Sequence, residues 1–136
     1  MGASDVTING GCHCGAVRYV ISGEVRRHSL CHCSDCRRCA GAVPVGWASV
    51  RRADLAVQGD TTIYRSSGDV ERRFCAGCGT GLFYESESLF PGLVDVQSAT
   101  FDDPDAHVPT ERIQLADAPE WLARAHLLPG HRRFPE

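Results

Sequence analysis

The sequence contains no lysine, so all 14 of its basic side chains are arginines. Most of these arginines stand in adjacent pairs with acidic residues between the pairs, a pattern typical of solvated strand faces. The formal net charge at pH 7 is −3, and two Zn²⁺ ions held by seven thiolates would change it by +4 and −7, to −6. This charge argues against nucleic acid as a partner.

Long apolar runs are also absent. No stretch approaches the ~20 apolar residues that a membrane span requires, and residues 1–6 lack the basic and apolar segments of a secretion signal. We therefore expect no membrane association and a cytoplasmic location. Thiols stay reduced in the cytosol, so the eight cysteines require an explanation other than disulfides.

Turn signals divide the chain into many short segments rich in β-branched and aromatic residues, and its length favours a single domain over residues 1–136. One or two helical turns are expected between residues 34 and 41, with Ser34 or Asp35 as N-cap, and a helix over 119–127 with Pro119 in its first turn. Residues 9–11 predict a turn. The fold class is all-β or β-dominated. The predicted strands are 6–8, 16–21, 25–30, 43–50, 55–57, 61–65, 70–74, 82–84, 93–97 and 112–115.

Two close cysteine pairs indicate one closed metal site. Cys75 and Cys78, followed by Gly79, form a zinc-knuckle pattern in which two thiolates chelate one ion while the glycine lets the backbone turn. Cys12 and Cys14, at another hairpin turn, supply the other half of a tetrahedron. Such a site would cross-link the two halves of the sheet as a structural zinc. Buried free cysteines at each location are the less common alternative.

A second group places three cysteines in one short loop. Cys31, Cys33 and Cys36 offer three ligands, and a zinc with three protein ligands and a fourth, exchangeable position is typical of catalytic sites. Cys39 continues the three-residue spacing. It is either a fourth ligand that closes the site or, more commonly for such a residue, a small buried core side chain.

These cysteines carry a resemblance to a known family. The motifs G-x-C-x-C-G, C-H-C-x-x-C-R-R-x-x-G and F-C-x-x-C-G-T-x-L-F-Y occur here at residues 10–15, 31–41 and 74–84. Together they resemble the glutathione-dependent formaldehyde-activating enzyme (GFA) family, also called the centromere protein V family. The similarity covers nearly the whole chain, because further matching stretches occur at 47–55, 59–60, 64–67, 107–108, 118–122, 127–129 and 133–136.

The resemblance implies an Mss4-like fold of short antiparallel sheets with zinc knuckles and two zinc ions. The CxC and CxxC pairs would hold the structural ion. The CxCxxC triple, Cys31, Cys33 and Cys36, would hold the ion assigned as catalytic. Family members act as carbon–sulfur lyases, with the reversible condensation of formaldehyde and glutathione to S-hydroxymethylglutathione as the reference reaction. Cys39 departs from the family, in which a small residue other than cysteine is usual.

Other side chains near these motifs have two interpretations. His32 and His13 could carry protons, but neighbouring residues in an extended loop point apart, so a structural role is expected for both. Arg37 and Arg38 could bind substrate carboxylates as planar forks. A solvated pair is the more common outcome for these arginines.

Three further residues have simpler explanations. Trp47 is expected in the core. His107 and Trp121 match positions of the family, and a place in the core or at the rim of the site accounts for both. None of the three is predicted to take part in chemistry.

Two functional classes follow. The first is a zinc enzyme acting on glutathione or a related thiol adduct. Three thiolates make zinc a weaker Lewis acid, which favours activation of a substrate sulfur over generation of hydroxide. The second class is a zinc-stabilised module without turnover, either a glutathione carrier or a protein-interaction domain.

Overall fold

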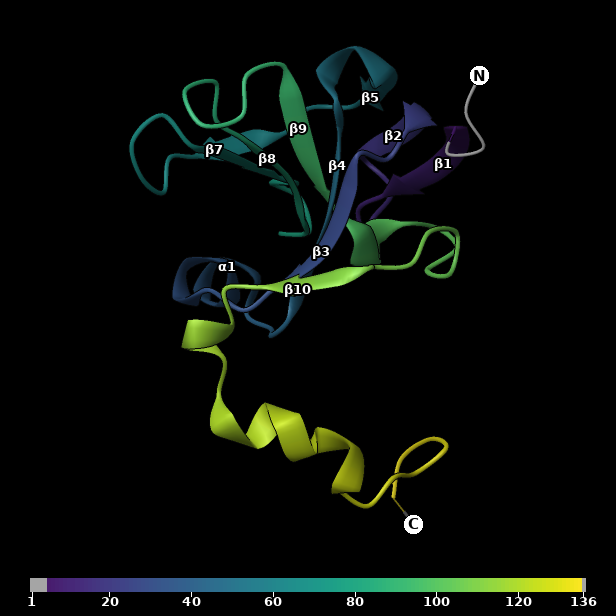
Figure 1. Cartoon of the computed structure of the whole chain (residues 1–136). Helices are drawn as coiled ribbons and strands as arrows, with labels where there is room; N and C mark the ends of the chain where they lie inside the picture. The colour runs from purple at the N-terminus through teal and green to yellow at the C-terminus, as the bar shows by residue number, and fades with distance from the viewer. Residues whose placement is uncertain (1–4, 136) are drawn as a thin grey trace.

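The computed structural model describes residues 5–135, which form ten strands, one α-helix and four 3₁₀ segments (Figure 1). Two predictions concern residues outside this range. They are the part of the missing secretion signal that falls on residues 1–4 and the family match at Glu136. The strands are β1 Asp5–Gly11, β2 Arg18–Glu24, β3 Arg27–Cys31, β4 Val45–Arg51, β5 Leu55–Gln58, β6 Thr62–Tyr64, β7 Glu71–Phe74, β8 Gly81–Glu85, β9 Leu93–Gln97 and β10 Glu111–Ile113. The helical segments are α1 Ser34–Ala40, η1 Arg52–Asp54, η2 Ser98–Thr100, η3 Leu115–Asp117 and η4 Glu120–Leu127.

The strands form two sheets, which confirms the β-dominated class and is consistent with an Mss4-like fold. One sheet has the order β1-β2-β5, and the other has the order β10-β3-β4-β9-β8-β7-β6. Each predicted strand overlaps one observed strand. The pairing is antiparallel as expected, except that β10 pairs in parallel with β3. A parallel pair cannot be joined by a tight turn, and here residues 32–110, which include β4 to β9, separate β3 from β10.

The core lies between the two sheets. Alternation along β2 directs Tyr19 and Ile21 inward, where they join Val50, Val96 and Phe83 of the larger sheet in one buried cluster. The rings of Tyr19 and Phe83 meet edge to face with centroids 5.5 Å apart. The residues just beyond these strands are thereby held in fixed positions.

Two local predictions were wrong. Residues 9–11 do not turn: β1 continues to Gly11, and the turn follows at the cysteines. A Cβ on Gly10 would lie 2.3 Å from the Tyr19 hydroxyl, so this glycine permits close packing within a strand rather than a turn. The predicted helix over 119–127 exists as the 3₁₀ segment η4, and Pro119 lies just before it instead of in its first turn.

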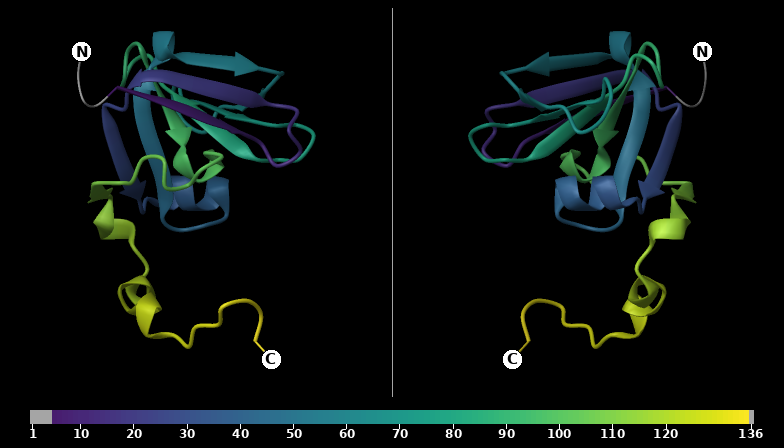
Figure 2. Two further views of the ribbon diagram at one scale, coloured as in Figure 1. Left: turned by 90° about the vertical axis from the view of Figure 1, so that its right-hand side faces the viewer. Right: turned by 90° about the vertical axis from the view of Figure 1, so that its left-hand side faces the viewer.

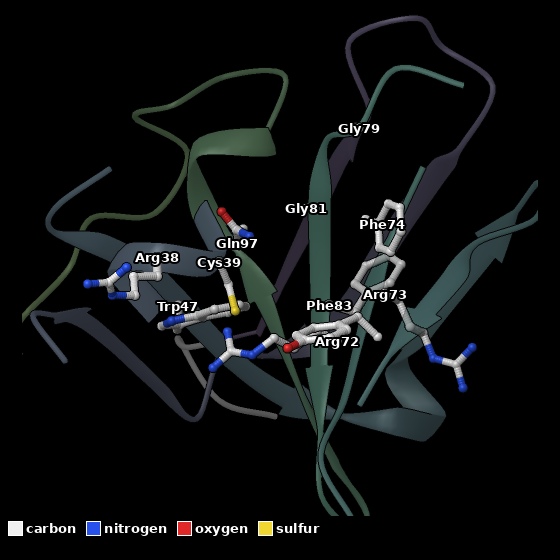
Figure 3. A pocket seen from close by; sticks show the side chains of 11 residues that line it. Arg38, Cys39, Trp47, Arg72, Arg73, Phe74, Gly79, Gly81, Phe83 and Gln97 are labelled. Atoms are coloured by element: carbon white, nitrogen blue, oxygen red, sulfur yellow. The ribbon is translucent and has the colours of Figure 1, made fainter. Parts of the chain in front are cut away.

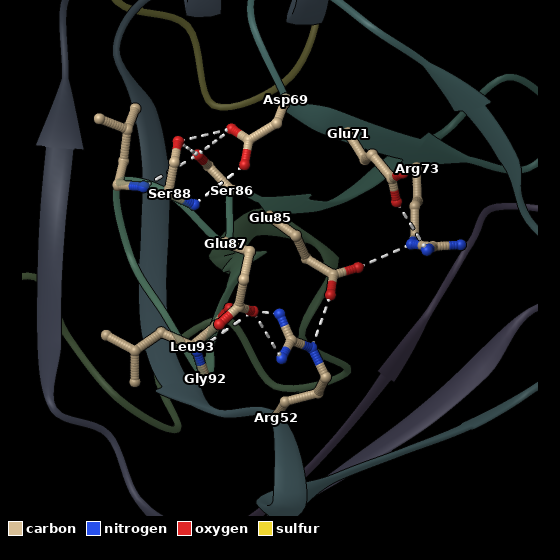
Figure 4. A network of polar contacts seen from close by, with 11 residues as sticks. Arg52, Asp69, Glu71, Arg73, Glu85, Ser86, Glu87, Ser88, Gly92 and Leu93 are labelled. Carbon is tan, nitrogen blue, oxygen red and sulfur yellow. Dashed lines mark hydrogen bonds and ion pairs between the residues drawn. The ribbon is translucent and has the colours of Figure 1, made fainter.

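A network of ion pairs fixes the hairpin of β7 and β8 (Figure 4). Arg73 Nε donates to Glu85 at 2.7 Å, and Arg52 Nε donates to the other Glu85 oxygen at 2.8 Å. Arg73 also reaches Glu71 at 3.0 Å. Because strand side chains alternate, Arg73 on this face leaves its neighbour Arg72 to point to the opposite face.

In residues 5–135 there is no helix long and apolar enough to span a bilayer. The chain after β10 leaves the body of the molecule. Figures 1 and 2 show η4 and the residues that follow it extending away from both sheets, and we call residues 118–135 the C-terminal arm.

Candidate metal centres

Four cysteines meet between the two sheets. The sulfurs of Cys12, Cys14, Cys75 and Cys78 all lie within 4.8 Å of one another. The Cys12 and Cys14 sulfurs are 3.6 Å apart, and those of Cys14 and Cys75 are 3.7 Å apart. A tetrahedral zinc with Zn–S bonds of ~2.3 Å needs sulfurs about 3.8 Å apart. We call this set the four-cysteine cluster, and its dimensions fit a structural metal site.

Two turns build the four-cysteine cluster. The turn between β1 and β2 carries Cys12 and Cys14, and the turn between β7 and β8 carries Cys75 and Cys78, so the cluster joins one sheet to the other. Gly79 has a φ of +83°, a backbone conformation that is strained for any residue with a side chain. The prediction that the two pairs come together is borne out in the geometry.

Hydrogen bonds to two of these sulfurs, those of Cys12 and Cys78, lower the thiol pKa and favour the thiolate form. The Val17 N–H donates to the Cys12 sulfur at 3.2 Å. The Thr80 hydroxyl lies 3.2 Å from the Cys78 sulfur and, by donating to it, lowers the pKa of that thiol to about 5. A ligand that is already ionised binds a metal ion without first losing a proton.

The second cluster lies at the beginning of α1. Cys31 ends β3, Cys33 is the N-cap, and Cys36 lies in the first turn, with all three sulfurs within 4.8 Å of one another. The Cys36 N–H donates to the Cys33 sulfur at 3.2 Å, so Cys33, and neither Ser34 nor Asp35, caps the helix. Burial raises the pKa of the Cys31 thiol to about 12. We call this set the three-cysteine cluster.

Cys39 follows neither of its predicted roles. It does not belong to the three-cysteine cluster, and it is exposed instead of buried in the core. An α-helix rises 1.5 Å per residue, which places Cys39 about 4.5 Å farther along the axis than Cys36 and away from the loop that supplies Cys31. Among the described residues, Cys39 therefore does not add a fourth sulfur to the three-cysteine cluster.

Arg72 is a site residue that the sequence reasoning missed. Its terminal nitrogens lie 3.8 and 3.7 Å from the Cys36 sulfur, and its guanidinium lies over the Tyr84 ring, 5.0 Å from the centroid. A guanidinium at this position stabilises negative charge on the sulfur. The alternation of side chains in β7 was the available signal, because Arg72 and Arg73 must face opposite sides.

Two cavities meet beside the three-cysteine cluster. The cysteine cavity, of about 180 Å³, is bounded by the cluster together with Asp95, Tyr84 and Ile113. The arginine cavity, of about 470 Å³, is lined by Arg38 and Cys39 among others (Figure 3). Arg72 and Trp47 line both cavities. In Figure 3 Arg72 points toward Trp47 and Cys39, whereas Arg73 points away.

Several predictions about neighbouring residues are now decided. Trp47 is buried, as expected, and also forms cavity wall. His32 is buried with its Nδ1 3.1 Å from the Ile113 carbonyl oxygen, in agreement with a structural role, whereas His13 is exposed. His107 is half-buried with its Nδ1 3.0 Å from Nδ1 of the buried His28, and it is not among the residues that bound either cavity.

Two of the earlier expectations need correction. Trp121 is exposed on the C-terminal arm, because the arm does not fold back on the sheets, so neither a core nor a rim position holds for it. The arginines after Cys36 also differ from each other. Arg38 is exposed yet lines the arginine cavity, whereas Arg37 is half-buried and is not among the residues that bound either cavity.

Asp95 brings a carboxyl group to the cysteine cavity from the centre of the larger sheet. Desolvation raises its pKa to about 6, against the opposing effects of a hydrogen bond to Ser49 and the charge of Arg27. A carboxyl group that titrates near neutral pH can both accept and release a proton during a reaction. The sequence pattern predicts only that Asp95 lies in a strand.

The raised pKa of Asp95 predicts a pH-dependent stability. The folded state holds this proton more tightly than the unfolded chain, so the wild type should lose stability as pH rises from about 4 to about 6. Asp95→Asn should remove this loss and be more stable at pH 7.5 by about 1–2 kcal/mol, after allowance for partial solvent exposure.

Urea unfolding of the wild type and of Asp95→Asn at pH 5 and pH 7.5 measures this difference in the free energy of unfolding. Both proteins have the same cysteines, so the pH dependence that the cysteines contribute cancels in the difference. Asp60→Asn, at an exposed carboxylate, is the control and should give the same difference from wild type at both pH values. A gain from Asp95→Asn that does not grow with pH would contradict the assignment.

Comparison with known proteins places this site in a family. The model of the glutathione-dependent formaldehyde-activating enzyme family matches residues 7–117, a range that contains both cysteine clusters. The chain belongs to the GFA family. That residues 1–136 form a single domain stays a prediction.

The relatives of this GFA family chain include named enzymes. A putative glutathione-dependent formaldehyde-activating enzyme of Halomonas elongata is 34% identical over 128 residues, covering 85% of this chain and 79% of that protein. An uncharacterized lyase of Schizosaccharomyces pombe is 27% identical over 112 residues, with 72% and 82% covered. A crystal structure of a Rhodobacter sphaeroides protein matches with a TM-score of 0.60 and 29% identity, over 77% of this chain and 99% of that one.

Proposed function

We propose that this GFA family chain is a zinc-dependent carbon–sulfur lyase that acts on glutathione or a related thiol adduct. The reference reaction is the condensation of formaldehyde with glutathione to S-hydroxymethylglutathione. The observation that carries the proposal is the three-cysteine cluster, which has three sulfurs and borders a cavity. A cytoplasmic location is part of the proposal, because the reducing cytosol keeps these thiols available.

Two zinc ions per chain fit the sulfur geometry. The four-cysteine cluster, Cys12, Cys14, Cys75 and Cys78, would hold a structural ion. Cys31, Cys33 and Cys36 would hold the ion at the reaction centre and are the proposed catalytic residues. A zinc ion held by three thiolates, with an exchangeable fourth position, stabilises the thiolate form of a substrate sulfur.

The arginine cavity is suited to the rest of glutathione. Its volume of about 470 Å³ lies in the usual range of small-molecule sites. Arg38 and Arg72 present guanidinium groups that pair well with carboxylates, and glutathione carries two of these. Trp47 provides an apolar wall between the carboxylate end and the cysteine cavity. This assigns to Arg38 the carboxylate-binding role rather than that of a solvated side chain.

Asp95 is placed to move the proton. In the forward direction its carboxylate accepts the proton of the substrate thiol, and the sulfur electron pair forms the C–S bond to the formaldehyde carbon. The C=O π pair becomes an alkoxide, which takes the proton back from Asp95. Atoms and charges balance without another reactant, and the reverse sequence releases formaldehyde. Arg72 meanwhile compensates negative charge at Cys36.

X-ray absorption at zinc, together with metal counting and a turnover assay, tests the proposal. Seven cysteine sulfurs on two ions give about 3.5 sulfurs per zinc, and a glutathione thiolate should raise this to about 4. Cysteamine, a thiol without carboxylates, is the control and should require a higher concentration because Arg38 and Arg72 have nothing to pair with.

The other functional classes correspond to distinct results. A raised sulfur count without turnover of S-hydroxymethylglutathione would indicate a glutathione carrier. An unchanged sulfur shell at saturating thiol would exclude the lyase and favour a protein-interaction module. Protein purified under reductant without bound zinc would overturn all of these readings together.

A further inference from the structure

The C-terminal arm is an extended segment that begins just after the range matched by the family model. The family match ends at residue 117, and the arm comprises residues 118–135. Both views in Figure 2 show it running away from the sheets, with η4 as its one ordered helical segment. The residues that the lyase proposal uses all lie before it.

The arm exposes large apolar side chains. Trp121 is 55% exposed, Leu127 69%, Leu128 66% and Phe134 90%. Single apolar residues are common at protein surfaces, but a run of large ones along one segment marks an interaction site. Eight residues are also long for a 3₁₀ helix, since its poor hydrogen-bond geometry usually limits it to 3–4 residues. The exposed apolar side chains indicate a segment whose packing partner lies outside its own fold.

The base of the arm is fixed in a direction away from its own body. Gln114 adopts a left-handed conformation with φ 57°, and within residues 5–135 it is the one non-glycine residue with a positive φ. Three residues later, Asp117 accepts a hydrogen bond from the Ser34 N–H at the start of α1, at 3.3 Å. With the chain turned at Gln114 and attached at Asp117, the arm does not fold back on the surface it leaves.

Charge favours the body of another copy as the partner. Residues 118–136 carry three arginines, Arg124, Arg132 and Arg133, against two acidic residues, Glu120 and Glu136, which gives this end of the sequence a charge of +1. Residues 1–117 carry 11 arginines and 15 acidic residues, a charge of −4. A basic arm and an acidic body in the same sequence attract each other between copies.

The available area favours a reciprocal contact. An aromatic side chain offers about 150–250 Å², so the four exposed side chains together offer on the order of 500 Å². One arm docked on one body would bury on the order of 1,000 Å² counted over both surfaces, below the range of stable interfaces. Two arms exchanged across a two-fold axis would bury on the order of 2,000 Å², which lies within that range.

An apolar acceptor surface exists on the body. Leu89 and Phe90, in the loop between β8 and β9, are exposed, and Glu87, which pairs with Arg52 at 3.3 Å, precedes them in the same loop. Phe90 lines the cysteine cavity and a neighbouring cavity of about 300 Å³. Ile113, just before the base of the arm, lines both cavities as well. A two-fold axis near this position would bring each arm to the other copy's acceptor loop.

We propose that the C-terminal arm docks on a second copy of this chain and that two copies exchange arms in a symmetric dimer. Trp121 and Phe134 are the principal anchors, and Leu89 and Phe90 are the acceptor. The dimer does not depend on thiol chemistry.

Sedimentation velocity of the full zinc-loaded chain tests the dimer. The wild type is expected to be a dimer at micromolar concentration, and the double variant Trp121→Ser/Phe134→Ser should raise the dissociation constant by about 30-fold or more. Val57→Ser/Val108→Ser is the matched control, because both valines are exposed on the body, and it should remain dimeric. Circular dichroism and zinc content of each variant confirm that it folds.

Three results would overturn the proposal. These are a monomeric wild type at tens of micromolar, a dimer that survives loss of both anchors, and a monomer in which Trp121 fluorescence is shielded from quencher by its own body. Because sedimentation needs neither glutathione nor formaldehyde, an inactive protein that still dimerises would contradict the lyase proposal and leave the arm proposal standing.

Discussion

Cys78→Ser is expected to remove one of the two zinc ions and most of the stability of the fold. The four-cysteine cluster holds the turn of one sheet against the turn of the other, so the loss of one ligand weakens the contact between the sheets. Structural zinc binding contributes about 10–16 kcal/mol in small zinc domains, and a domain of ordinary size has only 5–15 kcal/mol in total. A loss of about 5 kcal/mol would cancel the whole stability of a domain at the lower end of that range.

Zinc content and denaturant unfolding measure this effect. Cys39→Ser is the matched control, because Cys39 is exposed and outside both clusters, and this variant should keep two zinc ions and wild-type stability. A Cys78→Ser protein that binds two ions, or that unfolds at the same denaturant concentration as the control, would show that the four-cysteine cluster is not structural.

Cys33→Ser is expected to have the opposite profile: one zinc ion lost, turnover reduced at least 100-fold, and the fold retained. The three-cysteine cluster lies between the end of β3 and α1 and joins no sheets, so an ion bound there would contribute little to the core. The helix cap should also survive. Cys33 is the N-cap, its sulfur accepts the Cys36 N–H, and serine is among the best residues for that position.

Turnover of S-hydroxymethylglutathione, zinc content and thermal unfolding of the purified variant test this expectation. Its unfolding should resemble that of Cys39→Ser, and its zinc content should be half of the control's. Equal destabilisation by Cys33→Ser and Cys78→Ser would remove the distinction between a structural and a reaction-centre ion. Full turnover by the one-zinc variant would remove the catalytic assignment.

The cysteine spacing predicted much of the candidate site because ligand geometry is local. In C-x-x-C and C-x-C, two sulfurs can reach one ion whatever the rest of the fold, and a half-filled tetrahedron requires a second pair elsewhere. The strands were likewise visible in short apolar runs between turn residues. Cys39 shows the limit of this reasoning, because a repeated spacing of three residues does not indicate where a helix starts or which of its turns faces the loop.

Residues whose role depends on tertiary packing were missed. Gly10 reads as part of a turn, yet it is in a strand because the Tyr19 side chain crosses directly over it. Arg72 reads as half of a solvated pair, and only the position of α1 against β7 brings it to Cys36. In the sequence Asp95 is simply one residue of a strand. It borders the cysteine cavity only because the fold brings residues from other parts of the chain beside it. The contacts of Arg72 and Asp95 join segments that are far apart in sequence, whereas Gly10 and Tyr19 are cross-strand partners in one hairpin.

A structural ion in the four-cysteine cluster would also determine which parts of the molecule depend on metal for assembly. Cys14 and Cys75 are 61 positions apart, so an ion bound by both would close a long loop, whereas each of the two turns closes within a few residues. Closing the long loop costs chain entropy that neither hairpin alone offsets. In a chain folding without zinc, the contact between the two turns would therefore form less readily, and metal supply would affect when the two sheets join.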